Sequence, residues 1–148
     1  MGNRALIIMQ RPTEECPAVP AIYVHWNGGI ESVKAVCDIC QERGYRSPYF
    51  DPSYALARMT GVWHEFFGIN EATSLGLQMY DGKCDVGDNG VYLIGVDWNI
   101  IDHYYHGWNS GEIEQLEIEV PKDQQEKYEE IKKYLQEQYK KFLAANNS

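Results

Sequence analysis

The chain has 148 residues, of which 44% are apolar and 24% are charged, the proportions of one globular domain rather than of a disordered segment. It carries 22 acidic and 13 basic residues, a formal net charge of −9, and this argues against nucleic acid as a partner because phosphate contacts need Lys and Arg. No apolar run is long enough to span a membrane, so we expect no membrane partner. The N-terminus lacks the apolar core of a secretion signal, which predicts a soluble, cytoplasmic protein.

Apolar spacing and turn residues predict the elements in chain order. We expect strands at 4–9 and 21–26, helices at 30–43 and 53–67, strands at 73–80, 91–97, 99–105 and 112–120, and a helix from 121 to a frayed tail. Ser53 is the expected N-cap of the second helix, and residues 97–99 the turn of a hairpin. Residues 109–111 are expected to break the chain. The last strand, with its acidic residues, suits a solvated edge.

This order predicts an α+β fold in one domain, residues 1–148. The sheet is expected to be mainly antiparallel, with two helices inserted after strand two and a C-terminal helix packed on it. Residues 1–120 form the body, and residues 121–148 form the amphipathic C-terminal helix and its tail. Tyr128, Ile131, Leu135 and Phe142 are the expected apolar side of that helix.

Cys37 and Cys40 form a C-x-x-C pair inside the first predicted helix. With Val33 and Val36 they follow the spacing of a buried helical stripe, so we interpret them as buried thiols. Zinc binding or redox activity is the alternative, but the other two cysteines are isolated and zinc sites usually need more ligands. We expect no metal and no cofactor.

The segment Asn27-Gly28-Gly29-Ile30-Glu31-Ser32 joins a strand to a helix. It resembles the PP-loop of ATP pyrophosphatases, in which Ser-Gly-Gly-x-Asp-Ser binds phosphate, and the resemblance implies an anion held by backbone N–H groups at a helix start. Asn27 and Glu31 depart from that pattern, and the chain lacks the alternating strands and helices of that fold. The simpler interpretation is a structural turn with Asn27 or Ser32 as a helix cap.

Aspartates and histidines give no metal or catalytic pattern. The turn at residues 81–90 holds Asp81, Asp85 and Asp88, but Lys83 stands where a calcium loop needs its second acid, so we predict a hairpin loop. Histidines occur at positions 25, 64, 103 and 106 without the spacing of a metal site, and we interpret them as ordinary polar residues.

Aromatic residues are abundant, with 11 Tyr and 4 Trp, and many lie near predicted turns or strand ends. Tyr and Trp favour binding surfaces, although they also fill small cores, and the sequence leaves these two roles open. The residues concerned are Tyr23, Trp26, Tyr80, Tyr92, Trp98, Tyr104, Tyr105 and Trp108.

The run YVHWNGGIESV at residues 23–33, taken with GDNGVY at residues 87–92, resembles a family of small bacterial proteins often carried by phages and plasmids. The resemblance spans about residues 20–105. It implies a small cytoplasmic protein connected with mobile elements and anti-defence. That family has no assigned activity, so no catalytic residue is carried over from it.

Two turns are therefore the candidate ligand-binding site. Its predicted residues are His25, Trp26, Asn27, Gly28, Gly29, Ser32, Asp88, Asn89 and Tyr92. If strands two and four are neighbours, these turns form one pocket for a small polar ligand with a flat ring. We predict a non-enzymatic binding protein for a cytoplasmic protein or a small polar ligand; the alternative is a nucleotide-phosphate-binding enzyme that uses residues 27–32. The sequence leaves the oligomeric state open.

Overall fold

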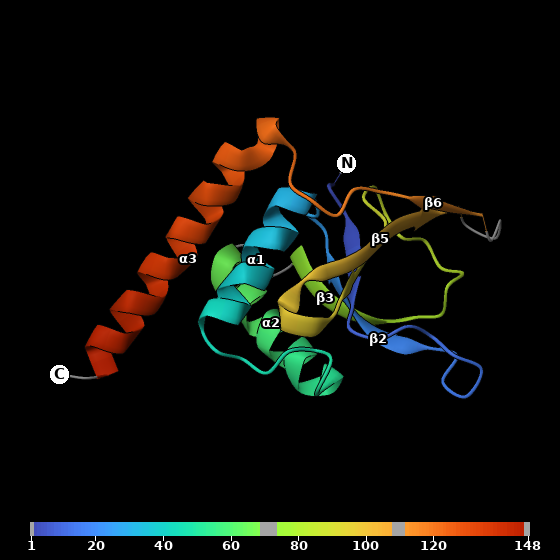
Figure 1. The fold of residues 1–148 in the computed structure, drawn as a ribbon, viewed down its shortest axis with the longest axis horizontal. Coiled ribbons are helices and arrows are strands. Elements are labelled where there is room, and N and C mark those ends of the chain that lie inside the picture. The colour runs from blue at the N-terminus through green and yellow to red at the C-terminus, as the bar shows by residue number, and fades with distance from the viewer. Residues whose placement is uncertain (1, 69–73, 108–111, 147–148) are drawn as a thin grey trace.

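The computed structural model describes residues 2–68, 74–107 and 112–146, and these form a six-stranded sheet and three α-helices. The α+β class is confirmed (Figure 1). The strands are β1 (Ala5–Ile8), β2 (Val19–Val24), β3 (Leu75–Tyr80), β4 (Val91–Ile94), β5 (Ile100–His106) and β6 (Ile113–Gln115). Their order across the sheet is β3-β2-β1-β4-β5-β6, so β3 and β6 form its two edges.

The sheet is mixed rather than purely antiparallel. Strands β1 and β4 run parallel, while every other neighbouring pair in the order is antiparallel. A parallel pair needs a long crossover, which the chain between Ile8 and Val91 supplies. Strand β1 also separates β2 from β4, so predicted strands two and four are not neighbours. The condition on which the joint pocket depended is therefore not met.

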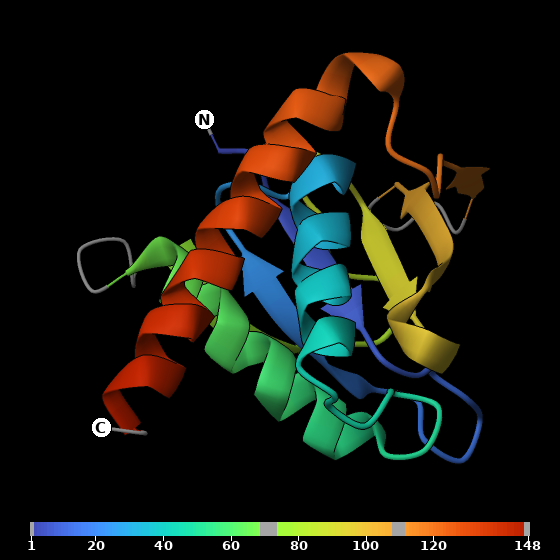
Figure 2. The same cartoon turned by 60° about the vertical axis from the view of Figure 1, so that its left-hand side comes forward.

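Strand β1 is buried on both faces of the sheet. Ala5 and Ile7 belong to one core cluster, and the alternate residues Leu6 and Ile8 belong to the other. Helices α1 (Ile30–Glu42) and α2 (Pro52–Phe67) cover the first face (Figure 2). We call the second one the back face. Val86, from the segment between β3 and β4, packs in its core.

The cysteine pair lies in the core between α1 and the sheet. Cys37 and Cys40 are fully buried, together with Val33 and Val36, as the helical stripe predicted. Burial raises the pKa of both thiols, which keeps them protonated. Among the described residues, no group of three or more His, Cys, Asp or Glu is placed to hold a metal ion.

The N-cap of helix α2 lies two residues earlier than predicted, so Ser53 is not the cap. Asp51 takes that role, and its side chain accepts a hydrogen bond of 3.1 Å from the backbone N–H of Tyr54. Pro52 occupies the first turn, where a missing N–H costs no helical hydrogen bond. The cap must therefore precede the proline.

The two predicted strands that shorten most are those at 91–97 and 112–120. Strand β4 ends at Ile94, and residues Val96–Trp98 form a 3-10 turn (η2) in which Asp97 and Trp98 have positive φ angles. The Trp98 indole N–H donates to the carbonyl of Tyr45 at 2.9 Å, so a core contact decides the shape of this turn. The acidic strand predicted at 112–120 is reduced to the three residues of β6, although its place at a sheet edge is confirmed.

The C-terminal helix α3 (Gln125–Asn146) follows a short 3-10 turn, η3 (Lys122–Gln124), and packs on α1 rather than on the sheet. Ile131 and Leu135 are buried as predicted, and Tyr128 packs beside them. Phe142 is 54% exposed, so the predicted apolar side does not continue to the end of the helix.

Ion pairs fasten α3 to the rest of the helical layer. Lys127 and Lys132 lie 3.2 Å from the carboxylates of Glu31 and Glu42 on α1. Helix α3 extends through Asn146, so residues predicted as tail are helical. Residues 147–148, like Trp108 and the predicted chain break at 109–111, lie outside the described residues. In the described part of the chain, no helix combines the length and the apolar character that crossing a membrane requires.

Candidate functional site

The two predicted turns do approach each other, but through the residues that precede β1. The backbone N–H of Gly28 donates to Asn3 O, and the backbone N–H of Asn89 donates to Arg4 O, at 2.8 and 2.9 Å. The Asn89 amide also donates to the Asn3 side-chain oxygen at 2.5 Å. The hydroxyl of Tyr92, which is buried, donates to the carbonyl of Gly28 at 2.7 Å.

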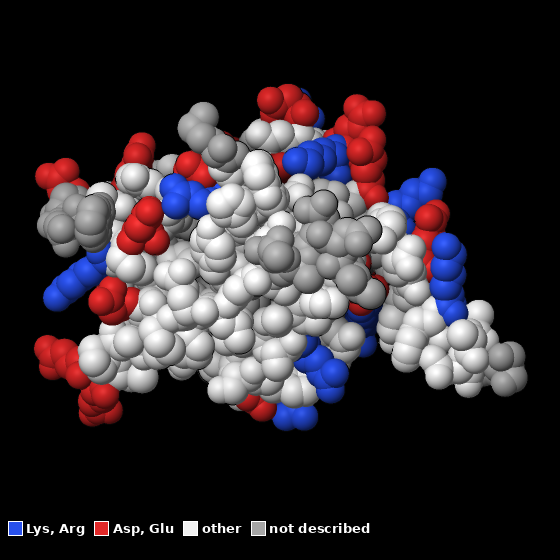
Figure 3. Space-filling view, turned by 180° about the vertical axis from the view of Figure 1, so that it is seen from behind, with Lys and Arg blue, Asp and Glu red and all other residues white. Residues whose placement is uncertain are grey.

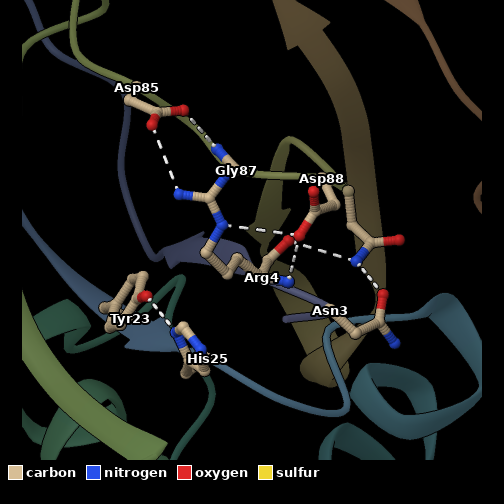
Figure 4. A network of polar contacts seen from close by, with 8 residues as sticks. Asn3, Arg4, Tyr23, His25, Asp85, Gly87 and Asp88 are labelled. Carbon is tan, nitrogen blue, oxygen red and sulfur yellow. Dashed lines mark hydrogen bonds and ion pairs between the residues drawn. The ribbon is translucent and has the colours of Figure 1, made fainter. Parts of the chain in front are cut away.

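We call Asn3, Arg4, Gly28, Asp88, Asn89 and Tyr92 the turn cluster. Arg4 contacts the carboxylates that give this cluster its charge (Figure 4). Its backbone N–H lies 3.0 Å from the Asp88 carboxylate, and its guanidinium lies 3.3 and 3.4 Å from Asp85 and Asp88. The hydrogen bond from the Arg4 backbone N–H is the main cause that lowers the pKa of Asp88. The aspartates of this loop therefore bind the chain itself.

Close backbone approach explains two glycines of the turn motifs. A Cβ on Gly28 would lie 2.4 Å from the carbonyl oxygen of Asn3. A Cβ on Gly90 would lie 2.3 Å from the carbonyl oxygen of Tyr104, and Gly90 also has a positive φ of 79°. Packing of backbone on backbone requires both glycines without any ligand.

The start of α1 carries its own negative charge. The N-cap is Gly29, without a side-chain hydrogen bond, so neither Asn27 nor Ser32 caps the helix as the structural interpretation supposed. The buried carboxylate of Glu31 lies beside Gly29, since a Cβ there would be 2.6 Å from its oxygen, and Lys127 lies 3.2 Å away. A phosphate at this helix start would meet that carboxylate, and like charges repel.

Among the described residues, the remaining predicted site residues form no hydrogen bond with Asp88 or Asn89, although the carbonyl of His25 accepts one of 2.8 Å from the backbone N–H of Asn3. Trp26 is 44% exposed and packs edge-on against His25 at a ring distance of 5.1 Å. The Tyr23 hydroxyl lies 2.7 Å from Nδ1 of His25. Asn27 has a positive φ of 61°. The buried hydroxyl of Ser32 has no hydrogen-bond partner among the described residues.

His103 is a structural residue beside the turn cluster. Its ring stacks on Tyr92 at 3.9 Å, and its two nitrogens lie 2.7 Å from the carbonyl oxygens of Glu117 and Asn89. The ring therefore ties the loop before β4 to the segment after β6. This supports the interpretation of His103 as an ordinary polar histidine.

A different set of polar groups meets on the back face of the sheet. The hydroxyls of Tyr80, on β3, and Tyr104, on β5, lie 3.1 Å apart, and Nε2 of His106 lies 2.9 Å from the Tyr80 hydroxyl. Three strands separate β3 from β5 in the sheet order, a span of roughly 19 Å if the sheet were flat. Two tyrosine side chains reach across only because the sheet curls around this face.

These three side chains line a cavity of about 300 Å³, which we call the Tyr104 cavity. Arg11, Asp81, Asp102 and Ile113 also contribute to its lining. The Arg11 guanidinium pairs with the Asp102 carboxylate at 2.7 Å, so these two charges cancel. The aromatic rings and Ile113 provide apolar wall, and the hydroxyls provide the polar group.

The hydrogens in the series His106–Tyr80–Tyr104 can be assigned by starting from His106. Nδ1 of His106 lies 3.3 Å from the carbonyl of Gly107, which only accepts, so Nδ1 carries the hydrogen. In a neutral ring Nε2 then accepts from Tyr80, Tyr80 accepts from Tyr104, and the Tyr104 oxygen keeps a free lone pair. If both ring nitrogens carry hydrogen, Nε2 donates to Tyr80 and Tyr80 donates to Tyr104. The O–H of Tyr104 is then free to donate to a ligand. Burial raises the pKa of both tyrosines, so both remain neutral hydroxyls.

No local sequence pattern predicts this cavity as a binding site. Tyr80 and Tyr104 occur among the many aromatic residues, and the spacing of His106 is that of an ordinary polar residue. One local signal was present, because Asp102, Tyr104 and His106 alternate along β5 and so share one face. Their meeting with Tyr80 depends on sheet order and curvature, which local sequence does not carry.

Comparison with protein-family models, with curated proteins and with solved structures finds no match to this chain. The resemblance to phage- and plasmid-borne proteins, the link to anti-defence and the cytoplasmic location therefore stay predictions. Function has to be argued from the geometry of the two regions described above.

Proposed function

We propose that this chain is a non-enzymatic binding protein whose small ligand occupies the Tyr104 cavity. The observation that carries the proposal is the convergence of Tyr80, Tyr104 and His106 from two distant strands on one cavity. Apolar walls with a few convergent polar groups are the usual form of a small-molecule site. The cavity volume of about 300 Å³ suits a single ring with small substituents.

The charges at the cavity favour a neutral ligand with a ring hydroxyl. Arg11 is already paired with Asp102, and Asp81 adds a negative charge at the lining. An anionic ligand would meet that carboxylate, and the lining residues that the structure describes offer it no unpaired cation. A hydroxyl can donate to Tyr104 or accept from it, so it satisfies both proton arrangements of the chain.

Binding is favoured over catalysis by the state of the hydroxyls. A tyrosine whose pKa is raised by burial is a poor general base near neutral pH, because ionising it is costly. The same raised pKa preserves the O–H group as a hydrogen-bond donor. The cavity is therefore better suited to recognise a ligand than to remove its proton.

Phenol is the first probe, because it is a neutral ring with one hydroxyl. Titration of phenol into the full chain, followed by two-dimensional NMR of the backbone amides, should give saturable shifts centred on residues 80, 104 and 106. Benzoate should bind more weakly because of Asp81. Equal or stronger binding of benzoate would contradict the neutral-ligand proposal.

The Tyr104→Phe variant removes one hydroxyl and keeps the ring. We expect it to weaken phenol binding about fivefold, the effect of losing roughly 1 kcal/mol of hydrogen bonding. Tyr105→Phe is the matched control, since Tyr105 is the next residue on β5 and its side chain points to the opposite face. Unchanged affinity in the Tyr104 variant, or equal loss in both variants, would overturn the assignment.

A further inference from the structure

The edge of the sheet formed by β3 is open and uncharged. Its six residues, Leu75–Tyr80, include no charged side chain, and Leu77 and Met79 are 64% and 57% exposed. A long, apolar edge strand is a template for pairing with another strand. The opposite edge differs, because β6 has three residues with Glu114 at its centre.

The peptide groups that face outward on β3 can be assigned. The backbone N–H of His25 donates to the carbonyl of Ser74 at 2.8 Å, in step with the β2–β3 register. Even-numbered residues therefore bond towards β2, and the odd-numbered residues Leu75, Leu77 and Met79 turn their N–H and C=O outward. Within the described residues, no backbone bond outside the β2 ladder reaches these three positions.

The same three residues place their side chains on the helix-covered face. Leu75 and Leu77 lie opposite Val24 and Ile22, which belong to the helix-side core. The outward peptide groups and the apolar side chains of this edge thus belong to the same residues. An incoming strand would gain hydrogen bonds and apolar contacts in one register.

This edge is complementary to itself. In an antiparallel pair centred on Leu77, Leu77 lies opposite its own copy, and Leu75 lies opposite Met79 of the other copy. All three are hydrogen-bonded pairs, and all three bring apolar side chains together on the same face. On the back face, Gly76 of each copy then lies opposite Gln78 of the other. The two do not crowd each other, because glycine has no side chain.

The symmetry of this edge favours a second copy as the occupant, because each of its exposed apolar positions meets an apolar position of the other copy. Two chains of net charge −9 repel each other at long range, and an uncharged contact surface adds no further repulsion. The side of α2 turned away from Arg58 and Glu65 carries Ser53, Ala57, Thr60 and His64 at helical spacing, without a carboxylate or a Lys or Arg. Viewed from behind, the described charged residues lie mostly near the outline of the molecule (Figure 3).

We propose that two copies of this chain pair antiparallel through β3, about a two-fold axis at Leu77, to form one continuous sheet. Pairing adds six backbone hydrogen bonds, two for each bonded pair. It leaves the Tyr104 cavity on the back face of each copy, so the proposal does not rest on the proposed function. The two-fold axis fixes which residue of one copy lies opposite each β3 residue of the other copy.

The first test is the mass of the full chain by sedimentation equilibrium at increasing concentration. The wild-type chain should approach twice the monomer mass. Leu77→Lys places two like charges opposite each other and should raise the dissociation constant at least tenfold, or about 1.4 kcal/mol. Ile101→Lys on β5 is the matched control, because Ile101 is 50% exposed on a strand away from the β3 edge. A monomeric wild-type chain, or equal effects of both variants, would overturn the proposal.

Crosslinking tests the register. In a Cys16→Ser background, which removes the exposed native thiol, Leu77→Cys should give a disulfide-linked dimer on mild oxidation. The two Cα atoms of a bonded pair lie about 5.5 Å apart, within disulfide range. Met79→Cys should not link, because its copies lie roughly 13 Å apart along the strands. Linkage at position 79 without linkage at position 77 would overturn the pairing.

Discussion

The turn cluster and the Tyr104 cavity are both built from polar side chains at strand ends, but their hydrogen bonds end in different places. In the turn cluster, Asn89 and Tyr92 donate to oxygens of Asn3 and Gly28, so the bonds close within the chain. In the cavity, the bonds run from His106 through Tyr80 to Tyr104, and all three residues line open space. A conspicuous motif can thus be a scaffold, while scattered residues form the site.

The largest expected effect concerns the glycines of the turn cluster region. Gly90→Ala should lower the free energy of unfolding by at least about 3 kcal/mol, because it combines a positive φ with a clash against the Tyr104 carbonyl. Gly44→Ala is the control, with a φ of 77° and no atom within 4 Å of the new Cβ. It should cost only about 1 kcal/mol. Equal losses in urea unfolding would show that the close approach is unimportant.

Next in size is the side chain of Asn89. Asn89→Ala removes two hydrogen bonds, to the side chain of Asn3 and to the carbonyl of Arg4, and should cost about 2 kcal/mol of stability. Asn99→Ala removes one local bond to Val96 on the surface and should cost less than about 0.5 kcal/mol. Chemical denaturation of both variants gives the comparison. A harmless Asn89 variant would mean that this residue is free to serve a ligand.

Asp88 should make the stability of the turn cluster depend on pH. Its pKa is lowered from the ordinary 3.8 by Arg4, so the folded chain favours the carboxylate. The resulting stability is fully present above the ordinary value and is lost as pH falls through the lowered pKa. Asp88→Asn should therefore be less stable than wild type near neutral pH, by less than about 1 kcal/mol because water screens the exposed pair with Arg4. The difference should shrink below about pH 4, and a difference that grows in acid would contradict the assignment.

The smallest expected effect is that of a nucleotide. ATP, with or without magnesium, should leave the melting temperature unchanged, because Glu31 already supplies a negative charge at the start of α1. A ligand bound only to the folded state raises the melting temperature, and the rise grows with the logarithm of its concentration relative to its dissociation constant. Stabilisation that rises with ATP concentration would restore the phosphate-binding enzyme as the function.

Local signals predicted most of the elements. Alternating and 3.6-residue patterns located the strands and helices, and the buried stripe of Cys37 and Cys40 followed from spacing alone. The N-cap of α2 could also have been predicted, because Pro52 fits the first turn of a helix and the cap must then be Asp51. The shape of residues 95–99 was not, because the contact of Trp98 with Tyr45 is distant in sequence.

Sheet order and the cavity could not be predicted in this way. The parallel pairing of β1 with β4 joins segments more than eighty residues apart, and no local pattern specifies it. The contact between Tyr80 and Tyr104 depends on that order and on the curl of the sheet. Sequence motifs pointed to the turns because glycines and aspartates are conspicuous there, whereas backbone packing accounts for them.

Phenol affinity in two single variants shows whether the ligand occupies the Tyr104 cavity or the predicted turn site. Trp26→Ala removes an exposed aromatic of the predicted turn site, and Tyr104→Phe removes one hydroxyl of the cavity. We expect wild-type affinity in the Trp26 variant and about fivefold weaker binding in the Tyr104 variant, with both variants shown by NMR to be folded. The reverse pattern, with binding lost at Trp26 and kept at Tyr104, would contradict this expectation.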